Sequence, residues 1–408
     1  MRTLTPIWTA GADRGCDRLH ETGIIGSLRW WFESVLRGLG GGVCDPTSEG
    51  DRADRCPRDD GSFCQACRLF GAGERGRAFR ITVEEGRRLF AGGNILLPSG
   101  RVHRPIERAG GWFLHCDARV GDALQLRITP LHADDQTPLL TVPLVLIARH
   151  ASLGAKVSSG YGVVELFAQP DGMPLSVEPA LLDRLASGER RYHDVPDLRD
   201  FFFAKLTFED PEGDPGWWQR IGGIAEAAGG QIVDRGITLR LYDCRDDKQN
   251  RQKAEAVRRQ MQAIVRNGLL PTAPAVRNWL RFRWFPGLFA ESGRRELEER
   301  VFGRVSRQGN VGSRIQVSHA YRVGPNQWEF RVWGWLSARL LEGQARGRDQ
   351  FLEELRRALD RNEATWRQVM GAGGPICEVR EWHALRSGDD DGRSYLLRLL
   401  GIGKEGGT

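Results

Sequence analysis

The stretch GSLRWWF at residues 26–32 decides how the chain is divided, because a counterpart, VRNWLRF at residues 276–282, returns in its second half. Apolar residues recur with helical spacing around both stretches, so each is expected to lie on a helix. A hydrophobic-Phe-Gly turn and an arginine-led strand follow each helix. These motifs are LFG 69–71 and RITV 80–83 in the first half, and VFG 301–303 and RIQV 314–317 in the second. Three features in one order indicate an internal duplication.

The two copies differ in length between the helix and the turn. From Trp31 to Phe70 the separation is 39 residues, whereas from Trp279 to Phe302 it is 23. The first copy therefore carries an insertion, placed at about residues 43–67. A segment rich in Pro, Asp, Gly and Ser at 171–198 is expected to link the copies. We therefore expect an α+β protein with one domain at 1–170 and a second at 199–408.

Several elements are expected from local pattern alone. The apolar run at 142–147 and the run at 237–242 predict strands, and the spacing at Ala275–Phe285 predicts a helix. Residues Arg348–Met370 predict one long amphipathic helix. The tail from Ser387 is acidic and then glycine-rich, so it is expected to be mobile.

Four of the eight cysteines lie close together, in the insertion and at its edge. They are Cys44, Cys56, Cys64 and Cys67. The closing Cys-x-x-Cys places two thiolates at the spacing of a tetrahedral zinc site. The insertion has few hydrophobic residues, so a metal would take the place of a core. Zinc is the expectation; free thiols are the first alternative and disulfides the second.

The positive charge is concentrated in one region. The net charge is +6, yet residues 250–322 hold 15 basic and 5 acidic residues, leaving 44 basic and 48 acidic ones elsewhere. Arginine outnumbers lysine 54 to 5, and its planar guanidinium binds phosphate and stacks on bases. A GC-rich genome would explain that ratio but not the clustering. With no apolar run of about 20 residues, an intracellular protein with an anionic partner is expected.

A glycine-rich loop at 154–162 is a candidate phosphate-binding segment. Its three glycines would let backbone N–H groups approach a phosphate, although an ordinary turn is the alternative. Lys156 adds charge, Ser158 and Ser159 add hydroxyl groups, and Tyr161 adds a ring for stacking. The Walker spacing is absent. On the first helix, Arg29 and Trp30 could border a groove, although a tryptophan there more often packs in the core.

The signal for catalysis is poor. Asp13, Asp17, His20 and Glu21 share one glycine-flanked loop that could serve a metal-dependent or a metal-free nuclease. A short charged loop of this kind is more often solvated than catalytic. No nucleophile elbow, dinucleotide fingerprint or HExxH motif is present.

These motifs carry a resemblance to a known family. ETGIIGSLRWW at 21–31, CRLFG at 67–71 and the 154–162 loop resemble the RAMP superfamily. More narrowly, together with the opening LTPIWT at 4–9, they look like the family of first subunits of type III-B (Cmr) CRISPR effector complexes. The resemblance is specific over about 1–170, and the second half fits through the duplication.

The resemblance implies two tandem ferredoxin-like (RRM-like) RAMP domains and a cytoplasmic, non-catalytic RNA-binding subunit. It would contact CRISPR RNA near its 3′ end, the 5′ part of the target RNA and other effector subunits, without a membrane. A RAMP-type endoribonuclease that processes CRISPR RNA is the alternative. The predicted RNA-binding residues are Arg29, Trp30, Arg75, Lys156, Ser158, Ser159 and Tyr161 in the first half, with Arg277, Arg281, Arg307 and Arg314 added from the charge clustering.

Overall fold

The described residues form both helices and antiparallel strands. The structure is a computed structural model that describes residues 1–402 except 12, 14, 46–54, 74, 92–93, 99–110, 134–135, 168–176, 193–194, 223–246, 305–308, 345, 387 and 389–390. Within these described residues, no helix has both the length and the apolar character needed to cross a membrane.

The first half follows the order strand, helix, two strands, helix, strand. Its main elements are β1 (Arg2–Thr3), α1 (Glu21–Gly38), β2 (Phe79–Val83), β7 (Leu126–Pro130), α3 (Thr141–His150) and β8 (Val164–Glu165). β1 pairs antiparallel with β8, and β2 pairs antiparallel with β7. The segment leading into β7 runs along the N-terminus, because Ile7 and Arg119 exchange two backbone hydrogen bonds of 2.8 Å. The order across this region is therefore fourth strand, first, third and second.

The second half repeats that connectivity in a continuous sheet. Its main elements are β9 (Phe201–Glu209), α8 (Ala273–Trp279), β11 (Ile315–Val317), β12 (Ala320–Arg322), β13 (Gln327–Trp335), α10 (Arg348–Leu359), α11 (Glu363–Met370) and β14 (Glu378–Ala384). With β10 (Leu269–Leu270) at one edge, the sheet order is β10-β12-β13-β9-β14, and β11 also pairs with β13. The first strand again lies between the third and the fourth.

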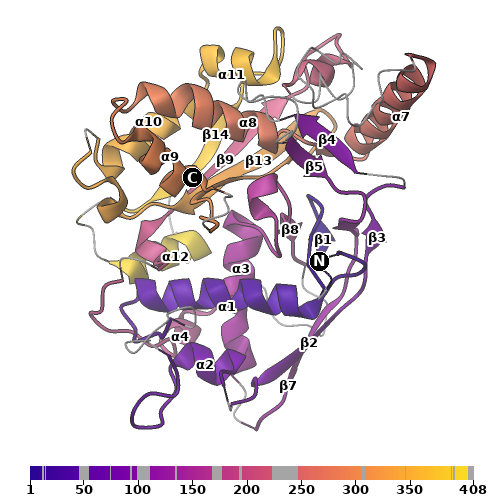
Figure 1. Cartoon of the computed structure of the whole chain (residues 1–408). Helices are drawn as coiled ribbons and strands as arrows, with labels where there is room; N and C mark the ends of the chain where they lie inside the picture. The colour runs from indigo at the N-terminus through magenta and orange to yellow at the C-terminus, as the bar shows by residue number, and fades with distance from the viewer. Residues whose placement is uncertain are drawn as a thin grey trace.

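Smaller elements surround these two units. They are α2 (Gln65–Phe70), β3 (Arg87–Arg88), β4 (Ile95–Pro98), β5 (Gly111–Leu114), β6 (Arg119–Val120), α4 (Pro179–Leu182), α7 (Asp247–Arg266), β10 (Leu269–Leu270), α9 (Arg294–Phe302) and α12 (Gly392–Leu400). β3 pairs with β6, and β4 pairs with β5. Helix α7 projects at the periphery (Figure 1).

Strand β9 lies between two cores. Phe202 and Ala204 face the hydrophobic core that includes Phe351 and Trp366 of α10 and α11. Phe201 and Phe203 face the other core, which includes residues of α1, α3 and α12. Successive side chains of a strand point to opposite faces, so one strand can serve both cores. Figure 1 shows α8 and α10 on one side of this sheet, and α1, α3 and α12 on the other.

The Phe-Gly turns of the two copies have the same backbone conformation. Gly71 ends α2 with φ 83° and ψ 156°, and Gly303 ends α9 with φ 79° and ψ 163°. The amide of Ala78 donates to Leu69, and the amide of Arg314 donates to Val301. These bonds align Ala78 with Arg314, two residues from the alignment of Arg80 with Arg314 that the sequence motifs predicted.

Several local predictions were wrong. The predicted strand at 142–147 lies within helix α3, because a short apolar run fits a buried helix as well as a strand. The helix predicted at Arg348–Met370 is broken between α10 and α11, where Arg361 has a φ of 50°. Residues Gly392–Leu400 of the tail form α12. The linker at 171–198 stays a prediction, and α4 lies within it. The run at 237–242 lies outside the described residues.

Candidate metal centre and nucleic-acid interface

Four cysteine thiols converge between α1 and α2. The Sγ of Cys44 lies 3.4 Å from that of Cys67 and 3.7 Å from that of Cys64. All four sulfur atoms, including that of Cys56, lie within 4.8 Å of one another, and none forms a disulfide. Sulfurs bound tetrahedrally to zinc at about 2.3 Å would be roughly 3.8 Å apart. The cluster therefore could hold a metal ion, and disulfide pairing does not describe it.

Contacts within the cluster favour a thiolate at Cys64, whereas hydrogen bonding to Cys64 and burial raise the pKa of Cys44 and Cys67. Hydrogen bonds from the Cys44 and Cys67 thiols lower the pKa of Cys64. The backbone amide of Cys64 donates to the Sγ of Cys56 at 3.3 Å. The guanidinium of Arg29 lies 3.4 Å from the Sγ of Cys67, so it places positive charge beside the sulfurs.

Arg29 and Arg277 occupy equivalent places and hold the two Phe-Gly turns. Arg29 donates to the carbonyl of Gly71 at 2.8 Å and pairs with Glu33 at 2.8 Å. Arg277 donates to the carbonyl of Phe302 and is buried. Both guanidinium groups are therefore committed to the protein, and this placement does not favour the predicted contact with RNA.

Trp30 and Arg281 are also engaged within the protein. The ring of Trp30 packs edge-on against Trp335 of β13, with 4.3 Å between centroids. Arg281 is buried and pairs with Glu298 at 2.7 Å. Trp30 joins the two halves, which agrees with the packing alternative for this residue.

The glycine-rich loop packs against its own protein. A Cβ on Gly160 would lie 2.7 Å from the ring of His319, and one on Gly154 would lie 2.6 Å from the carbonyl of Trp8. The backbone amide of His319 donates to the carbonyl of Gly160 at 3.0 Å. These glycines let protein segments from both halves approach closely. This packing agrees with the alternative that the loop is an ordinary turn.

The polar residues of this loop differ in access. Ser158 and Ser159 are half-buried in a single 3-10 turn. The ammonium of Lys156 lies 3.0 Å from Nε2 of His115 and 4.5 Å from the ring centroid of Trp8. Burial lowers the pKa of Lys156. Lys156 therefore contributes less charge to the surface than its sequence position predicts.

Tyr161 conflicts with its predicted role in stacking on a base. Its ring is fully buried, and its hydroxyl donates to the carbonyl of Phe113 at 3.0 Å. The same hydroxyl accepts from the amide of His115 at 2.8 Å. A base cannot reach a ring that is covered on both faces, so Tyr161 is a packing residue.

The remaining predicted arginines are dispersed. Arg75 is exposed, with its guanidinium 5.7 Å from the ring centroid of Phe63. Arg314 is half-buried at the start of β11. Arg307 lies outside the described residues. Of these, only Arg75 is both described and exposed.

The loop before α1 contains one polar pair. Nε2 of His20 lies 2.7 Å from a carboxylate oxygen of Asp17, and this hydrogen bond lowers the pKa of Asp17. Asp13 instead accepts from the amide of Gly15 at 2.9 Å and stabilises a turn. Glu21 pairs with Arg18 at 3.0 Å. Of these four residues, only His20 and Asp17 have the geometry of a general base and a hydrogen-bonding partner that orients it.

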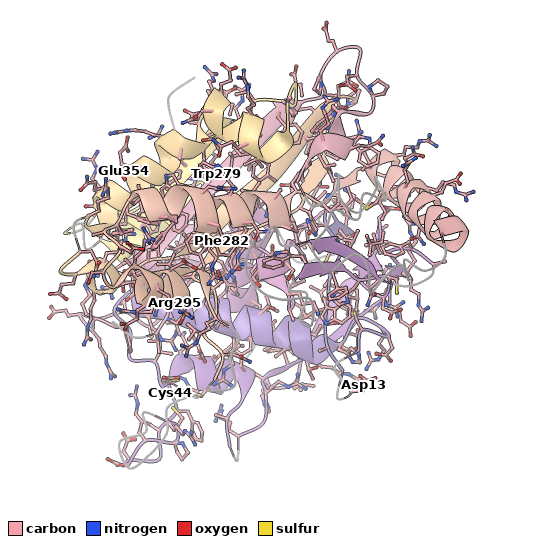
Figure 2. The ribbon with its side chains drawn as sticks, turned by 45° about the horizontal axis from the view of Figure 1, so that its top comes forward. Asp13, Cys44, Trp279, Phe282, Arg295 and Glu354 are labelled. Carbon is pink, nitrogen blue, oxygen red and sulfur yellow. The ribbon has the colours of Figure 1, made fainter. Side chains whose placement is uncertain are left out.

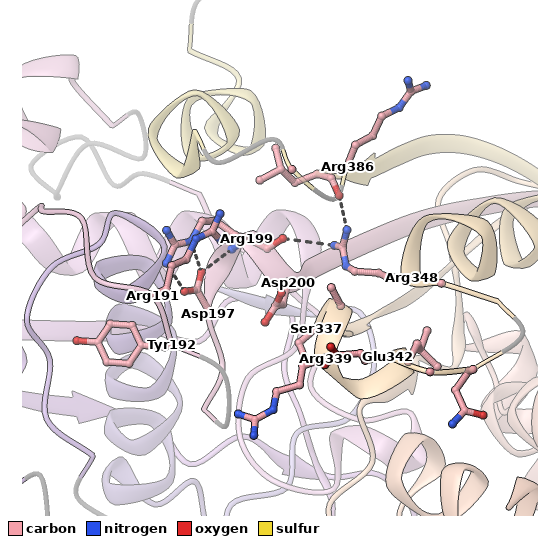
Figure 3. A pocket seen from close by; sticks show the side chains of 17 residues that line it. Arg191, Tyr192, Asp197, Arg199, Asp200, Ser337, Arg339, Glu342, Arg348 and Arg386 are labelled. Carbon is pink, nitrogen blue, oxygen red and sulfur yellow. Dashed lines mark hydrogen bonds and ion pairs between the residues drawn. The ribbon is translucent and has the colours of Figure 1, made fainter.

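A cavity of about 780 Å³ lies where the segments before β9, after β13 and after β14 meet (Figure 3). Its lining includes five arginines, which are Arg191, Arg199, Arg339, Arg348 and Arg386. Asp197, Asp200 and Glu342 are the three carboxylates of the lining. The lining is therefore net positive, as an anion-binding surface would be.

The cavity combines fixed and exposed arginines. Arg199 pairs with Asp197 at 2.5 Å, and Arg348 donates to backbone carbonyls, including that of Leu336 at 2.5 Å. Arg339 and Arg386 are exposed at the rim. Sequence reasoning missed this cavity, because its residues come from three distant segments with no shared motif.

Charged residues of the basic stretch lie elsewhere on the surface. Arg295 on α9 is exposed at 84% of its side chain and lies 3.4 Å from Glu299. Figure 2 shows Arg295 on the second half and Cys44 at the lower end of the molecule, on the first. The metal centre and the basic stretch therefore belong to different units.

Comparison with known proteins gives one match, which covers the first unit. Residues 1–165 match the RAMP superfamily model, and the match ends with β8. No curated protein matches the chain.

Proposed function

We propose that this chain is a non-catalytic RNA-binding subunit of a CRISPR ribonucleoprotein. The match of residues 1–165 to the RAMP superfamily carries the proposal. The arginine-lined cavity and the net charge of +6 support an anionic partner.

Both halves are, on this proposal, ferredoxin-like RAMP domains. The first half has the order strand, helix, two strands, helix, strand; the second follows it with β11 as an extra strand and with α10 and α11 in the place of one helix. In each, the first strand lies next to the last one, on the side away from the second. The equal backbone angles of Gly71 and Gly303 support a common origin for the two units.

The finer assignment is the first subunit of a type III-B (Cmr) effector complex. Its motifs at 21–31 and 67–71 support it. In that role the chain would contact CRISPR RNA near the 3′ end, the 5′ part of the target RNA and neighbouring subunits. Zn²⁺ held by Cys44, Cys56, Cys64 and Cys67 would stabilise the first unit and take no part in RNA chemistry.

RNA would contact exposed cations rather than the buried ones. Arg339 and Arg386 at the cavity rim are the leading candidates, because their side chains are exposed beside a net-positive cavity. Arg29 and Arg277 act through the turns that they hold.

Fluorescence anisotropy with a labelled single-stranded RNA, at two salt concentrations, tests the proposal. Binding should weaken with salt, and Arg339→Ala/Arg386→Ala should lower the slope of log K against log salt by about 1. Arg357→Ala, which removes an exposed arginine of α10, is the matched control. If the chain binds no RNA, alone or with its co-purifying partners, the proposed function is wrong.

An RNA-cleaving activity is the second candidate, and the His20–Asp17 hydrogen bond favours it. Incubating RNA with and without Mg²⁺ separates the two functions. Intact RNA supports a binding subunit. Cleavage that is lost in His20→Ala but retained in His132→Ala, at an exposed histidine, would establish the nuclease instead.

A further inference from the structure

His150, the last residue of α3, presents an unsatisfied ring nitrogen inside the molecule. The residue is 3% exposed, and its Nε2 lies 2.7 Å from the carbonyl oxygen of Leu399 in α12. A carbonyl only accepts, so Nε2 carries the proton and Nδ1 has a bare lone pair. That Nδ1 has no hydrogen-bond partner. Leaving a buried acceptor unsatisfied costs free energy, so a ligand at this position would stabilise the fold.

Two further metal-binding side chains face this nitrogen from β14. Glu381 and His383 are two residues apart on the strand, so they lie on the same face. A carboxylate oxygen of Glu381, Oε1, lies 3.7 Å from Nδ1 of His150 and 2.7 Å from Nε2 of His383. One ligand atom from each of the three residues lies within 4.8 Å of the others.

The surroundings orient these ligands. Lys205 of β9 lies 2.8 Å from the second oxygen of Glu381, Oε2, which leaves Oε1 to face the histidines. Burial alone would raise the pKa of Glu381, but hydrogen bonds from His383 and Lys205 outweigh it and lower that pKa. Burial lowers the pKa of His150 to about 3, so its imidazole is neutral. The Leu399 carbonyl and Lys205 thus act as the outer partners that metal ligands require.

We propose that His150, Glu381 and His383 form a binding site for one divalent first-row transition-metal ion, such as Zn²⁺. Two imidazoles and one carboxylate are a common ligand set for such ions, with at least one position left for water. The ligands come from both halves, and the His150–Leu399 hydrogen bond adds the C-terminal helix α12. The ion therefore acts as a clamp between the two units. Its nitrogen and oxygen donors set it apart from the cysteine cluster.

Elemental analysis of the full chain, saturated with ZnCl₂ and desalted, tests the site. Wild type should hold one equivalent of zinc more than His383→Gln and Glu381→Gln. Arg380→Gln, an exposed position on the same strand, should match wild type. Circular dichroism establishes that each variant is folded; both site residues are only partly buried, so their replacement spares the core.

Cobalt distinguishes this ion from one bound to cysteine. Loading the chain with Co²⁺ should give weak visible bands that persist in Cys64→Ser/Cys67→Ser but disappear in His383→Gln. Thiolate charge-transfer absorption should disappear in Cys64→Ser/Cys67→Ser and persist in His383→Gln. Equal metal content in folded wild type, His383→Gln and Glu381→Gln overturns the proposal.

Discussion

The two units form the same Phe-Gly turn, but the helix that precedes the turn differs between them. Gly71 and Gly303 have similar backbone angles, and Arg29 and Arg277 donate to adjacent carbonyls of the turn, those of Gly71 and Phe302. In the second unit, α9 has nine residues and buries Leu297, Val301 and Phe302. In the first unit, α2 has only six residues and begins at the cysteine cluster. Both helices bury apolar side chains, but on the proposed assignment an ion held by the cysteines would add support to the short helix.

Removing the cysteine ligands should have the largest effect and should affect one unit only. Cys64→Ser/Cys67→Ser should cost several kcal/mol, since structural zinc supplies about 10–16 kcal/mol in small zinc domains. Hydrogen exchange should accelerate at residues 64–71 and remain slow at 294–303. Cys116→Ala, outside the cluster, serves as the control. Equal protection at 64–71 in variant and wild type would show that α2 does not depend on the cluster.

Alanine at the two turn glycines should be comparably harmful in both units. A Cβ on Gly71 would lie 2.9 Å from the carbonyl oxygen of Arg75, and one on Gly303 would lie 2.7 Å from that of Val311. With the positive φ, each change should cost about 3 kcal/mol in chemical denaturation. Gly76→Ala and Gly312→Ala have open space and should cost less than about 0.5 kcal/mol. A large effect at only one turn would break the equivalence.

Truncating the two equivalent arginines separates a structural role from an RNA-binding role. Arg29→Ala and Arg277→Ala should each lower the free energy of unfolding by about 2 kcal/mol, because each loses a charged hydrogen bond to a buried turn. RNA affinity, measured by anisotropy on the folded variants, should remain within twofold of wild type. Reduced affinity with unchanged stability would restore the RNA contact that the sequence predicted.

The repeated elements were accessible to sequence reasoning because their signals are local. Helix α1, strands β2 and β9, and the convergence of Cys44, Cys56, Cys64 and Cys67 follow from periodicity and spacing. The apolar run in α3 was ambiguous, since neither periodicity nor length separates a short buried helix from a strand. Helix α12 did have a signal: Asp391 accepts from the amide of Ser394 and caps it.

The interface between the units could not be read from the sequence. Tyr161 and Arg277 have residue types typical of RNA-binding sites, yet both are buried. Each also contacts the other unit: the Tyr161 ring lies 5.7 Å from that of His319, and the Arg277 guanidinium lies 4.8 Å from the ring centroid of Trp112. His150 and its partners on β14 likewise come together only when the halves pack, whereas the cavity arginines converge from distant segments of the linker and the second unit.

Asp200, in the arginine-lined cavity, should give the smallest effect and one of opposite sign. Burial, with the charge of Asp197, raises its pKa to about 6. Because the folded pKa exceeds the unfolded value near 3.9, the carboxylate destabilises the fold above about pH 6, and this cost fades as pH falls towards 4. Asp200→Asn should therefore add about 1–2 kcal/mol at pH 7.5, with little gain at pH 4.5, in denaturation measured at both pH values. Asp122→Asn, at an exposed carboxylate, should show no such dependence. Asp200→Asn should also strengthen RNA binding, since it makes the cavity more positive. If Asp200→Asn raises stability but not RNA affinity, the RNA binds outside this cavity.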